Sequence, residues 1–273
     1  MNPAEVRAGR QPHDTGPDGK CPDATWLAGV TAALTWWAAE GWRLSTHPAP
    51  TSQVLGTGAV AVAERLFEAR WGGRAIMTPS NTAGTIAALL AVGVADRDVL
   101  VQPMEWHSTW AAVAALGGRP VSLDVPPGRP VTAADISRSL AGARRPRGVV
   151  LRPAAVLLAH HPHHEYSHLR ERWPRLSLLE DAATAPTTPP PAYRTAGTPD
   201  IALHSFGPGK DTDVGEGGMI NTHSARLYLR CMHYASHPAR ALEAGISADP
   251  AGGDLHTRPH PVAAVLLAHA LRP

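Results

Sequence analysis

Hydrophobic and polar positions follow two spacings that take turns along the chain. Short apolar runs bounded by Gly, Pro or polar residues indicate strands, and longer segments with an apolar residue every three or four positions indicate helices. The predicted strands cover residues 74–77, 98–102, 120–124, 154–159, 176–180, 201–205 and 218–221. The predicted helices cover residues 23–42, 60–69, 82–92, 108–116, 132–141, 165–173, 224–231 and 262–271. Residues 184–199 and 245–253 are predicted loops.

The alternation of strands and helices determines the expected fold class. We predict an α/β protein whose mostly parallel sheet carries helices on both faces. In such sheets a ligand binds beyond the carboxyl ends of the strands. Asp181 follows the apolar run at residues 176–180, so its carboxylate is predicted at that edge. Glu180 points to the other side of the strand and is expected to be structural.

Composition narrows the class of protein. The 273 residues are 44% hydrophobic and 18% charged, which is typical of a globular protein with a sizeable core. The formal net charge is +2 and the one short basic run, residues 144–147, is expected to be a solvated loop, so nucleic acid is not an expected partner. Two distant cysteines, Cys21 and Cys231, indicate neither a disulfide framework nor a metal site.

The ends of the chain and its tryptophans add to this picture. The N-terminus lacks a basic segment followed by an apolar one, and no apolar run is long enough to span a membrane. We therefore expect a cytoplasmic protein without a membrane partner, and a disordered leader over residues 1–22. The tryptophans of the first predicted helix are expected to be packing residues: Trp26, Trp36, Trp37 and Trp42.

One lysine stands out as a candidate for chemistry. The chain has only two lysines, Lys20 and Lys210, and only Lys210 lies between two predicted strands, at the end of a glycine-rich turn that starts at Ser205. A strand-end aspartate, a hydroxyl and a glycine-flanked lysine are what pyridoxal 5'-phosphate (PLP) chemistry needs. We expect Lys210 to attach PLP covalently, Asp181 to keep the pyridine nitrogen protonated, and Ser205 to bind the phosphate.

A second phosphate contact is predicted at a helix start. Gly84 and Thr85 open the helix predicted near residue 82, and backbone N–H groups at a helix N-terminus bind phosphate. An ordinary helix cap is the alternative interpretation.

These segments together resemble the DegT/DnrJ/EryC1/StrS aminotransferase family over about residues 55–271. The resemblance rests on Gly84-Thr85, residues 103–125, Glu180-Asp181-Ala182-Ala183, Ser205 to Gly218, and His256-Thr257-Arg258. It implies an aspartate-aminotransferase-like large domain that binds PLP. It also implies transfer of an amino group from Glu or Gln to a keto-sugar, cyclitol or related ketone in secondary-metabolite biosynthesis. Family relatives that dehydrate sugars carry His at the lysine position, so Lys210 favours amino transfer.

The resemblance also implies roles for further residues. Trp106 would stack on the cofactor ring, with His107 as its rival, and Thr184 would lie at the cofactor's phenolic oxygen, where the family has Gln or His. In a homodimer, His256 (Asn in the family) and Arg258 would reach the phosphate of the partner subunit.

The end of the chain leaves alternatives open. Family members continue into a small C-terminal domain, whereas this sequence ends at Pro273. We expect a PLP-binding domain over residues 23–250 and the start of a truncated C-terminal segment over residues 251–273. The alternatives are a PLP enzyme acting on a non-sugar amino acid or amine, or a PLP-fold subunit that is inactive alone and works with a partner.

A histidine-rich run is a candidate metal site. Residues 160–165 read His-His-Pro-His-His-Glu, which is a set of side chains that bind transition metals. The run lies at a strand-to-helix junction where a surface cluster without metal is favoured, so no metal is predicted.

Overall fold

The computed structural model describes residues 23–40, 56–103, 105–126, 128–142, 153–186, 189, 197–246 and 257–273. The predicted leader, the basic run at residues 144–147, Trp42 and His256 lie outside these ranges.

The described strands form one twisted sheet of seven strands. Their order is β1-β7-β6-β5-β4-β2-β3, and β7 alone runs antiparallel to its neighbours. The prediction of a mostly parallel sheet is therefore confirmed. The strands are β1 (Arg74–Thr78), β2 (Asp98–Val101), β3 (Arg119–Ser122), β4 (Pro153–Ala159), β5 (Ser177–Asp181), β6 (Ile201–Ser205) and β7 (Gly218–Thr222).

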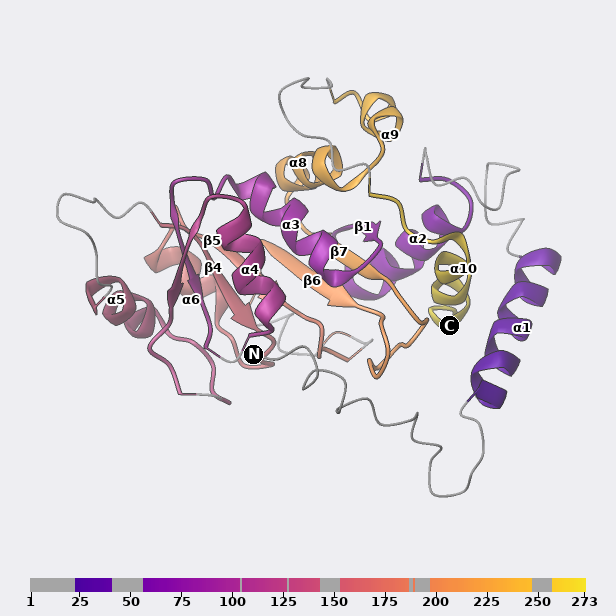
Figure 1. Ribbon diagram of the computed structural model, residues 1–273, viewed down its shortest axis with the longest axis horizontal. Coiled ribbons are helices and arrows are strands. Elements are labelled where there is room, and N and C mark those ends of the chain that lie inside the picture. Colours follow the sequence, from indigo (N-terminus) through magenta and orange to yellow (C-terminus); the bar gives the residue numbers. More distant parts are fainter. Residues whose placement is uncertain are drawn as a thin grey trace, which may run out of the picture.

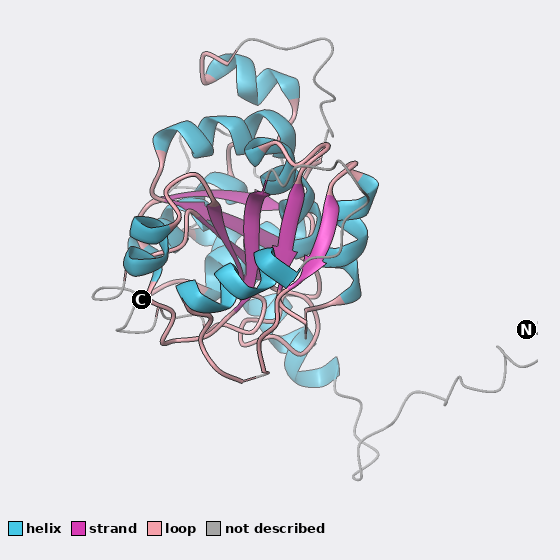
Figure 2. Ribbon diagram, turned by 90° about the vertical axis from the view of Figure 1, so that its left-hand side faces the viewer, coloured by secondary structure: helices cyan, strands magenta, loops and turns pink. Residues whose placement is uncertain are grey.

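Helices cover both faces of this sheet (Figures 1 and 2). Alternate residues of each strand point to opposite faces, so Ile76 packs under one set of helices while Ala75 and Met77 pack under another. The described helices are α1 (Asp23–Ala39), α2 (Ala59–Trp71), α3 (Asn81–Val92), α4 (His107–Ala115), α5 (Ala133–Gly142), α6 (Tyr166–Arg172), α8 (Ala225–Ala235), α9 (Pro238–Glu243) and α10 (Pro261–Ala270).

Three apolar clusters hold these layers together. Helices α3, α4 and α8 share one cluster with the sheet. On the opposite face, α5 and α6 cover the part of the sheet formed by β2, β4 and β5. Helices α1, α2 and α10 cover β1 and β7 on that face. Trp36 and Trp37 are buried in this last cluster, as packing residues should be.

The exposed edge of β1 is covered by side chains of α2 rather than by another strand. Glu64 and Glu68 lie one helical turn apart, and their carboxylates accept hydrogen bonds from Met77 N–H and Ala75 N–H, both at 2.8 Å. An edge strand otherwise presents unpaired N–H groups to solvent. The two carboxylates therefore accept the hydrogen bonds that a further strand would otherwise accept from this edge.

Most predicted elements occur within a few residues of their expected bounds. The predicted start of the helix over residues 132–141 is confirmed as a capping box, because Thr132 N–H donates to Asp135 Oδ2 at 2.8 Å and Asp135 N–H donates to Thr132 Oγ1 at 3.4 Å. Helix α9 was not predicted. It has only six residues, with Pro238 in its first turn and His237 as its N-cap, which is too short for a periodic pattern.

None of the helices in the described ranges has both the length and the apolar character that crossing a membrane requires.

Candidate active site

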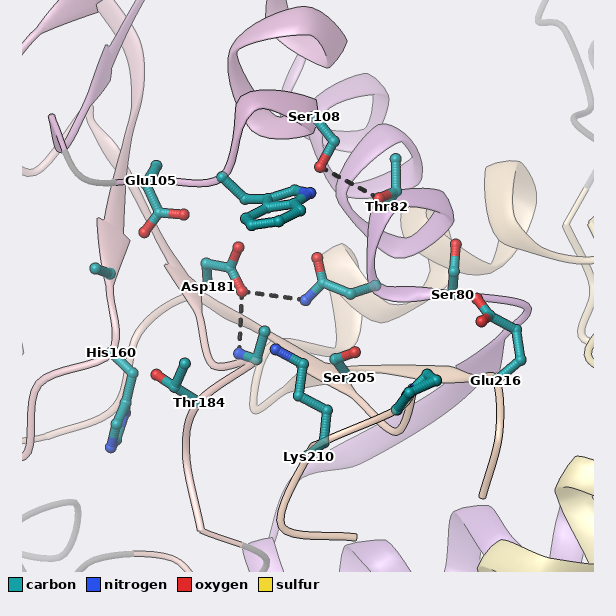
Figure 3. A pocket seen from close by; sticks show the side chains of 16 residues that line it. Ser80, Thr82, Glu105, Ser108, His160, Asp181, Thr184, Ser205, Lys210 and Glu216 are labelled. Atoms are coloured by element: carbon teal, nitrogen blue, oxygen red, sulfur yellow. Dashed lines mark hydrogen bonds between the residues drawn. The ribbon is translucent and has the colours of Figure 1, made fainter. Parts of the chain in front are cut away.

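A cavity of about 570 Å³ opens at the carboxyl ends of β4, β5 and β6 (Figure 3). This is the edge at which the alternating sequence pattern placed a ligand site. The N-terminal ends of α3 and α4 also line the cavity, so residues from distant parts of the sequence meet there. Five predicted site residues line it: Trp106, Asp181, Thr184, Ser205 and Lys210.

Asp181 ends β5 and is almost buried, with 8% of its surface exposed. Its Oδ1 accepts hydrogen bonds from Asn81 Nδ2 at 3.2 Å and from Ala183 N–H at 3.0 Å. Burial raises the pKa of Asp181 above its ordinary value. Hydrogen bonds from these donors and the nearby Lys210 amine offset part of this increase. The carboxylate is therefore held in one orientation at the floor of the cavity.

Lys210 stands on a tight turn after β6. Its own N–H donates to Gly207 O at 3.2 Å, and Gly209 has a left-handed φ of 76°, a conformation that residues with a Cβ seldom adopt. Asp213 fixes the same turn through hydrogen bonds from Gly209 N–H at 3.0 Å and Gly215 N–H at 2.8 Å. The lysine amine extends into the cavity near Asp181 and Ser205 (Figure 3).

Helix α3 begins at Asn81, one residue before the predicted Thr82, so its first turn lies ahead of the predicted phosphate-binding pair Gly84-Thr85. Ser80 is the N-cap and accepts from Ala83 N–H at 3.2 Å. The cavity is lined by Ser80, Asn81 and Thr82, whose first-turn N–H groups have no partner within the helix.

Gly84 and Thr85, the predicted phosphate-binding pair, do not line the cavity. The Gly84 N–H already donates to Ser80 O at 3.2 Å, and the buried Thr85 hydroxyl donates to Asn81 O at 3.0 Å. A Cβ on Gly84 would lie 3.3 Å from Ile220 Cγ1 and from Thr78 Oγ1. Gly84 thus lets α3 approach the sheet closely, one turn beyond the helix end that faces the cavity.

The loop before α4 contributes an aromatic ring and an acid. Trp106 lines the cavity and keeps 68% of its surface exposed, which is unusual for so large an apolar side chain. Its rival His107 is exposed and does not line the cavity. Glu105, which sequence reasoning missed, lies beside Asp181, and burial together with the Asp181 charge raises its pKa to about 9.

Two predicted residues are not brought to the cavity. Arg258 is exposed on the segment before α10 and does not line the cavity of its own chain. His256 lies outside the described residues, so its predicted role remains a prediction.

A histidine that the sequence analysis treated as part of a surface run lines the cavity instead. His160 follows β4, and its Nδ1 lies 2.5 Å from Oε1 of Glu180. Tyr166 donates its hydroxyl proton to the other oxygen of Glu180. Glu180 is fully buried on the opposite side of the strand from Asp181, in the structural position expected for it.

One further histidine of the run is buried within the fold. His164 is buried and lies 3.0 Å from Ala159 O through Nε2, while its Nδ1 accepts from Val131 N–H at 3.3 Å. Across the described part of the chain, no three His, Cys, Asp or Glu side chains converge as a metal site would require.

Some of the missed residues carried a sequence signal. Ser80-Asn81-Thr82 stands directly before an apolar helical run, which is the pattern of an N-cap and first turn. Glu105 and His160 each follow a predicted strand, as Asp181 does. The strand-end rule applied to all strands would have found them.

Comparison with known proteins agrees with this geometry. Residues 59–248 match the DegT/DnrJ/EryC1/StrS aminotransferase family. The erythromycin biosynthesis sensory transduction protein EryC1 of Saccharopolyspora erythraea is 32% identical over 153 residues, which are 52% of this chain and 38% of that protein.

Solved structures show the same fold. NtdA from Bacillus subtilis, with bound cofactor PMP, has a TM-score of 0.65 at 19% identity, over 91% of this chain and 53% of NtdA. DesI, determined in the presence of its TDP-sugar product, has a TM-score of 0.61 at 23% identity, over 88% of this chain and 56% of DesI. These likenesses confirm the predicted aspartate-aminotransferase-like α/β fold. The chain spans about two fifths to three fifths of the length of these relatives. Because the family match covers most of the chain, this protein belongs to the DegT/DnrJ/EryC1/StrS aminotransferase family.

Proposed function

We propose that this chain binds PLP through Lys210 and transfers an amino group from Glu or Gln to a keto-sugar, cyclitol or related ketone in secondary metabolism. The observation that carries the proposal is the meeting of Lys210, Asp181 and the first turn of α3 in one cavity. The family membership and the TDP-sugar product of the structural neighbour DesI support the choice of a sugar-like acceptor.

The residues of the cavity fit PLP. An amine, a carboxylate and an exposed aromatic ring line it, and these suit an aldehyde carbon, a ring nitrogen and a flat ring, respectively. The phosphate group would meet the Ser205 hydroxyl and the N-terminus of α3, where the N–H groups of Asn81 and Thr82 carry the positive end of the helix dipole. The cavity volume of about 570 Å³ is within the range of small-molecule sites.

Each side chain would have a definite task. When bound, PLP supplies an electron-withdrawing ring that stabilises negative charge on the Cα of the amino donor. Lys210 would hold the cofactor and, once displaced by the donor amine, carry a proton away from the donor's Cα. Asp181 would keep the ring nitrogen protonated, since an opposite charge in contact favours the charged form. Trp106 would cover one face of the ring, and the Thr184 hydroxyl would lie at its phenolic oxygen.

The working unit is proposed to be a homodimer. Arg258 is exposed and away from its own cavity, as a residue that binds the partner subunit's phosphate would be. His256 is proposed to accompany it. Residues 23–250 are proposed to form the PLP-binding domain, and α10, which follows them, packs against α2 and the sheet.

The experiment is a PLP titration of the purified chain, followed by visible absorbance and by tryptophan fluorescence. Wild type should show the absorbance of lysine-bound cofactor, and Lys210→Ala should lose it while its circular dichroism stays unchanged. Lys20→Ala, the substitution of the only other lysine, is the matched control and should behave as wild type.

A borohydride-reducible band that persists in Lys210→Ala would overturn the assignment. A second assay adds glutamate or glutamine and then a nucleotide-linked keto-sugar or a cyclitol ketone, and follows the aminated product. If PLP binds through Lys210 but no donor yields product, the chain is a subunit that requires a partner. Amination of a non-sugar ketone instead would assign a different class of acceptor and would leave the assignment of Lys210 as the PLP-binding lysine unchanged.

A further inference from the structure

Two carboxyl groups face each other inside the cavity. Asp181 ends β5, and Glu105 lies on the loop between β2 and α4, far away in the sequence. Both line the cavity, and their side chains lie within reach of each other. Figure 3 shows Glu105 at the Asp181 side of the cavity. Two oxygen acids can be bonded directly only if one of them carries a proton.

The surroundings identify which acid holds that proton. Burial raises the pKa of Asp181, but its Oδ1 accepts hydrogen bonds from Asn81 and from Ala183 and it lies near the Lys210 amine, and these contacts partly offset the effect of burial, so Asp181 is the better compensated anion of the two. Glu105 faces that anion and the more distant charge of Glu180.

Burial and the Asp181 charge act in the same direction on Glu105, raising its pKa to about 9, while a backbone hydrogen bond at Trp106 partly offsets them. The other titratable side chains that line the cavity are His160, Lys210 and Glu216. At neutral pH the pair therefore carries one negative charge, with the proton on Glu105.

We propose that Glu105 is a positioning residue for Asp181: as a neutral acid it donates a hydrogen bond to the Asp181 carboxylate and fixes it, together with Asn81, to receive one cationic ring nitrogen. This role rests on the proposed function, because it assumes a PLP ring at Asp181. Glu105 makes the net charge of the pair equal and opposite to that of one pyridinium. A second carboxylate in the ionised form would leave a buried negative charge without a partner.

The first test needs no cofactor. Glu105 has a pKa of about 9 in the folded protein against an ordinary value of 4.5, so the folded state keeps a proton that the unfolded chain releases between these values. The contribution of Glu105 to stability is therefore greatest below pH 4.5 and falls as the pH rises toward 9, by up to about tenfold in the unfolding constant per pH unit.

The measurement is urea unfolding of the full chain from pH 6 to about pH 8.5, compared among three proteins. Glu105→Gln cannot ionise, so its profile should lack this decline and cross above that of wild type as the pH rises. Glu171→Gln, on the exposed side of α6, is the matched control and should run parallel to wild type. Parallel profiles for wild type and Glu105→Gln would overturn the shared proton.

The second test separates positioning from mere packing. The Gln amide donates to a carboxylate as the neutral acid does, so Glu105→Gln should keep the PLP dissociation constant within about twofold at pH 7. Glu105→Ala removes the donor and should weaken PLP about tenfold, which corresponds to one hydrogen bond to a charged group. Equal weakening by both variants would overturn the positioning role. If wild type itself binds no PLP, the proposed function fails and this role with it, whereas the unfolding profiles still decide the shared proton.

Discussion

Two sets of buried acids in this protein are treated in opposite ways. Glu64, on α2, receives both guanidinium nitrogens of Arg240 at 3.0 and 2.7 Å and the N–H of Met77 at 2.8 Å. Asp181, at the cavity, receives its described hydrogen bonds from an amide, a backbone N–H and the acid Glu105. A charged donor compensates the first acid, and neutral donors surround the second.

Asp135 belongs with Glu64. Its side chain is 1% exposed and accepts from Arg129, Arg138 and Thr132. The hydrogen bond from Arg129 is the main reason that the pKa of Asp135 is held well below its usual value, whereas burial raises the pKa of both Asp181 and Glu105. The difference separates the structural acids, which are paired with arginines, from the acids of the cavity, whose charge a bound cation can neutralise.

The largest effect is expected where a compensated pair is broken. Glu64→Ala leaves the guanidinium of Arg240 buried without its partner and removes the acceptor for the edge of β1, so the free energy of unfolding should fall by about 3–5 kcal/mol. Urea unfolding measures it. Adding Arg240→Met to Glu64→Ala should restore part of the loss, because the unpaired charge is then gone. A single variant as stable as wild type would contradict the comparison.

At the cavity, removal of the charge of Asp181 should slow the reaction without lowering the free energy of unfolding. Asp181→Asn should keep PLP bound but slow amino transfer by about 10²–10³-fold, because the ring nitrogen loses the charge that keeps it protonated. Its unfolding free energy should equal or exceed that of wild type, since a poorly compensated buried charge is removed.

Single-turnover rates with glutamate and urea unfolding are the two measurements. Asp96→Asn is the control, because Asp96 is exposed and has a φ of 57°, which Asn tolerates. Unchanged rates in Asp181→Asn would move the role to another acid.

The smallest expected effect concerns the pH dependence of stability, which should have opposite signs for the arginine-paired acids and for the acids of the cavity. Asp135 has a folded pKa below its ordinary 3.8, so its contribution is present above pH 3.8 and is lost as the pH falls through the folded value. Asp135→Asn should therefore lower the unfolding free energy by about 1 kcal/mol at pH 7 and flatten only the acid side of the profile. The Glu105→Gln variant should change only the alkaline side. A change of Asp135→Asn on the alkaline side would refute this assignment.

The sequence by itself determined the succession of elements and the main chemical groups. Apolar runs and helical spacing are local properties, so the strands, the capping box at Thr132 and the glycine turn of Lys210 could be predicted from neighbouring residues alone. Asp181 could be placed because strand ends of a parallel sheet share one edge. The short helix α9 was missed, since it depends on a cap rather than on a repeating pattern.

Only the tertiary structure decided which of these groups meet. Strand order brings Glu105 against Asp181, and helix docking brings Arg240 to Glu64, 176 residues away. It also placed Gly84 close to Ile220 and Thr78, and placed Asn81 and Thr82 rather than Gly84 at the cavity. The physical reason is that a side chain's pKa and partners depend on burial and on charges within a few ångströms, and sequence spacing reports neither for residues that are far apart along the chain.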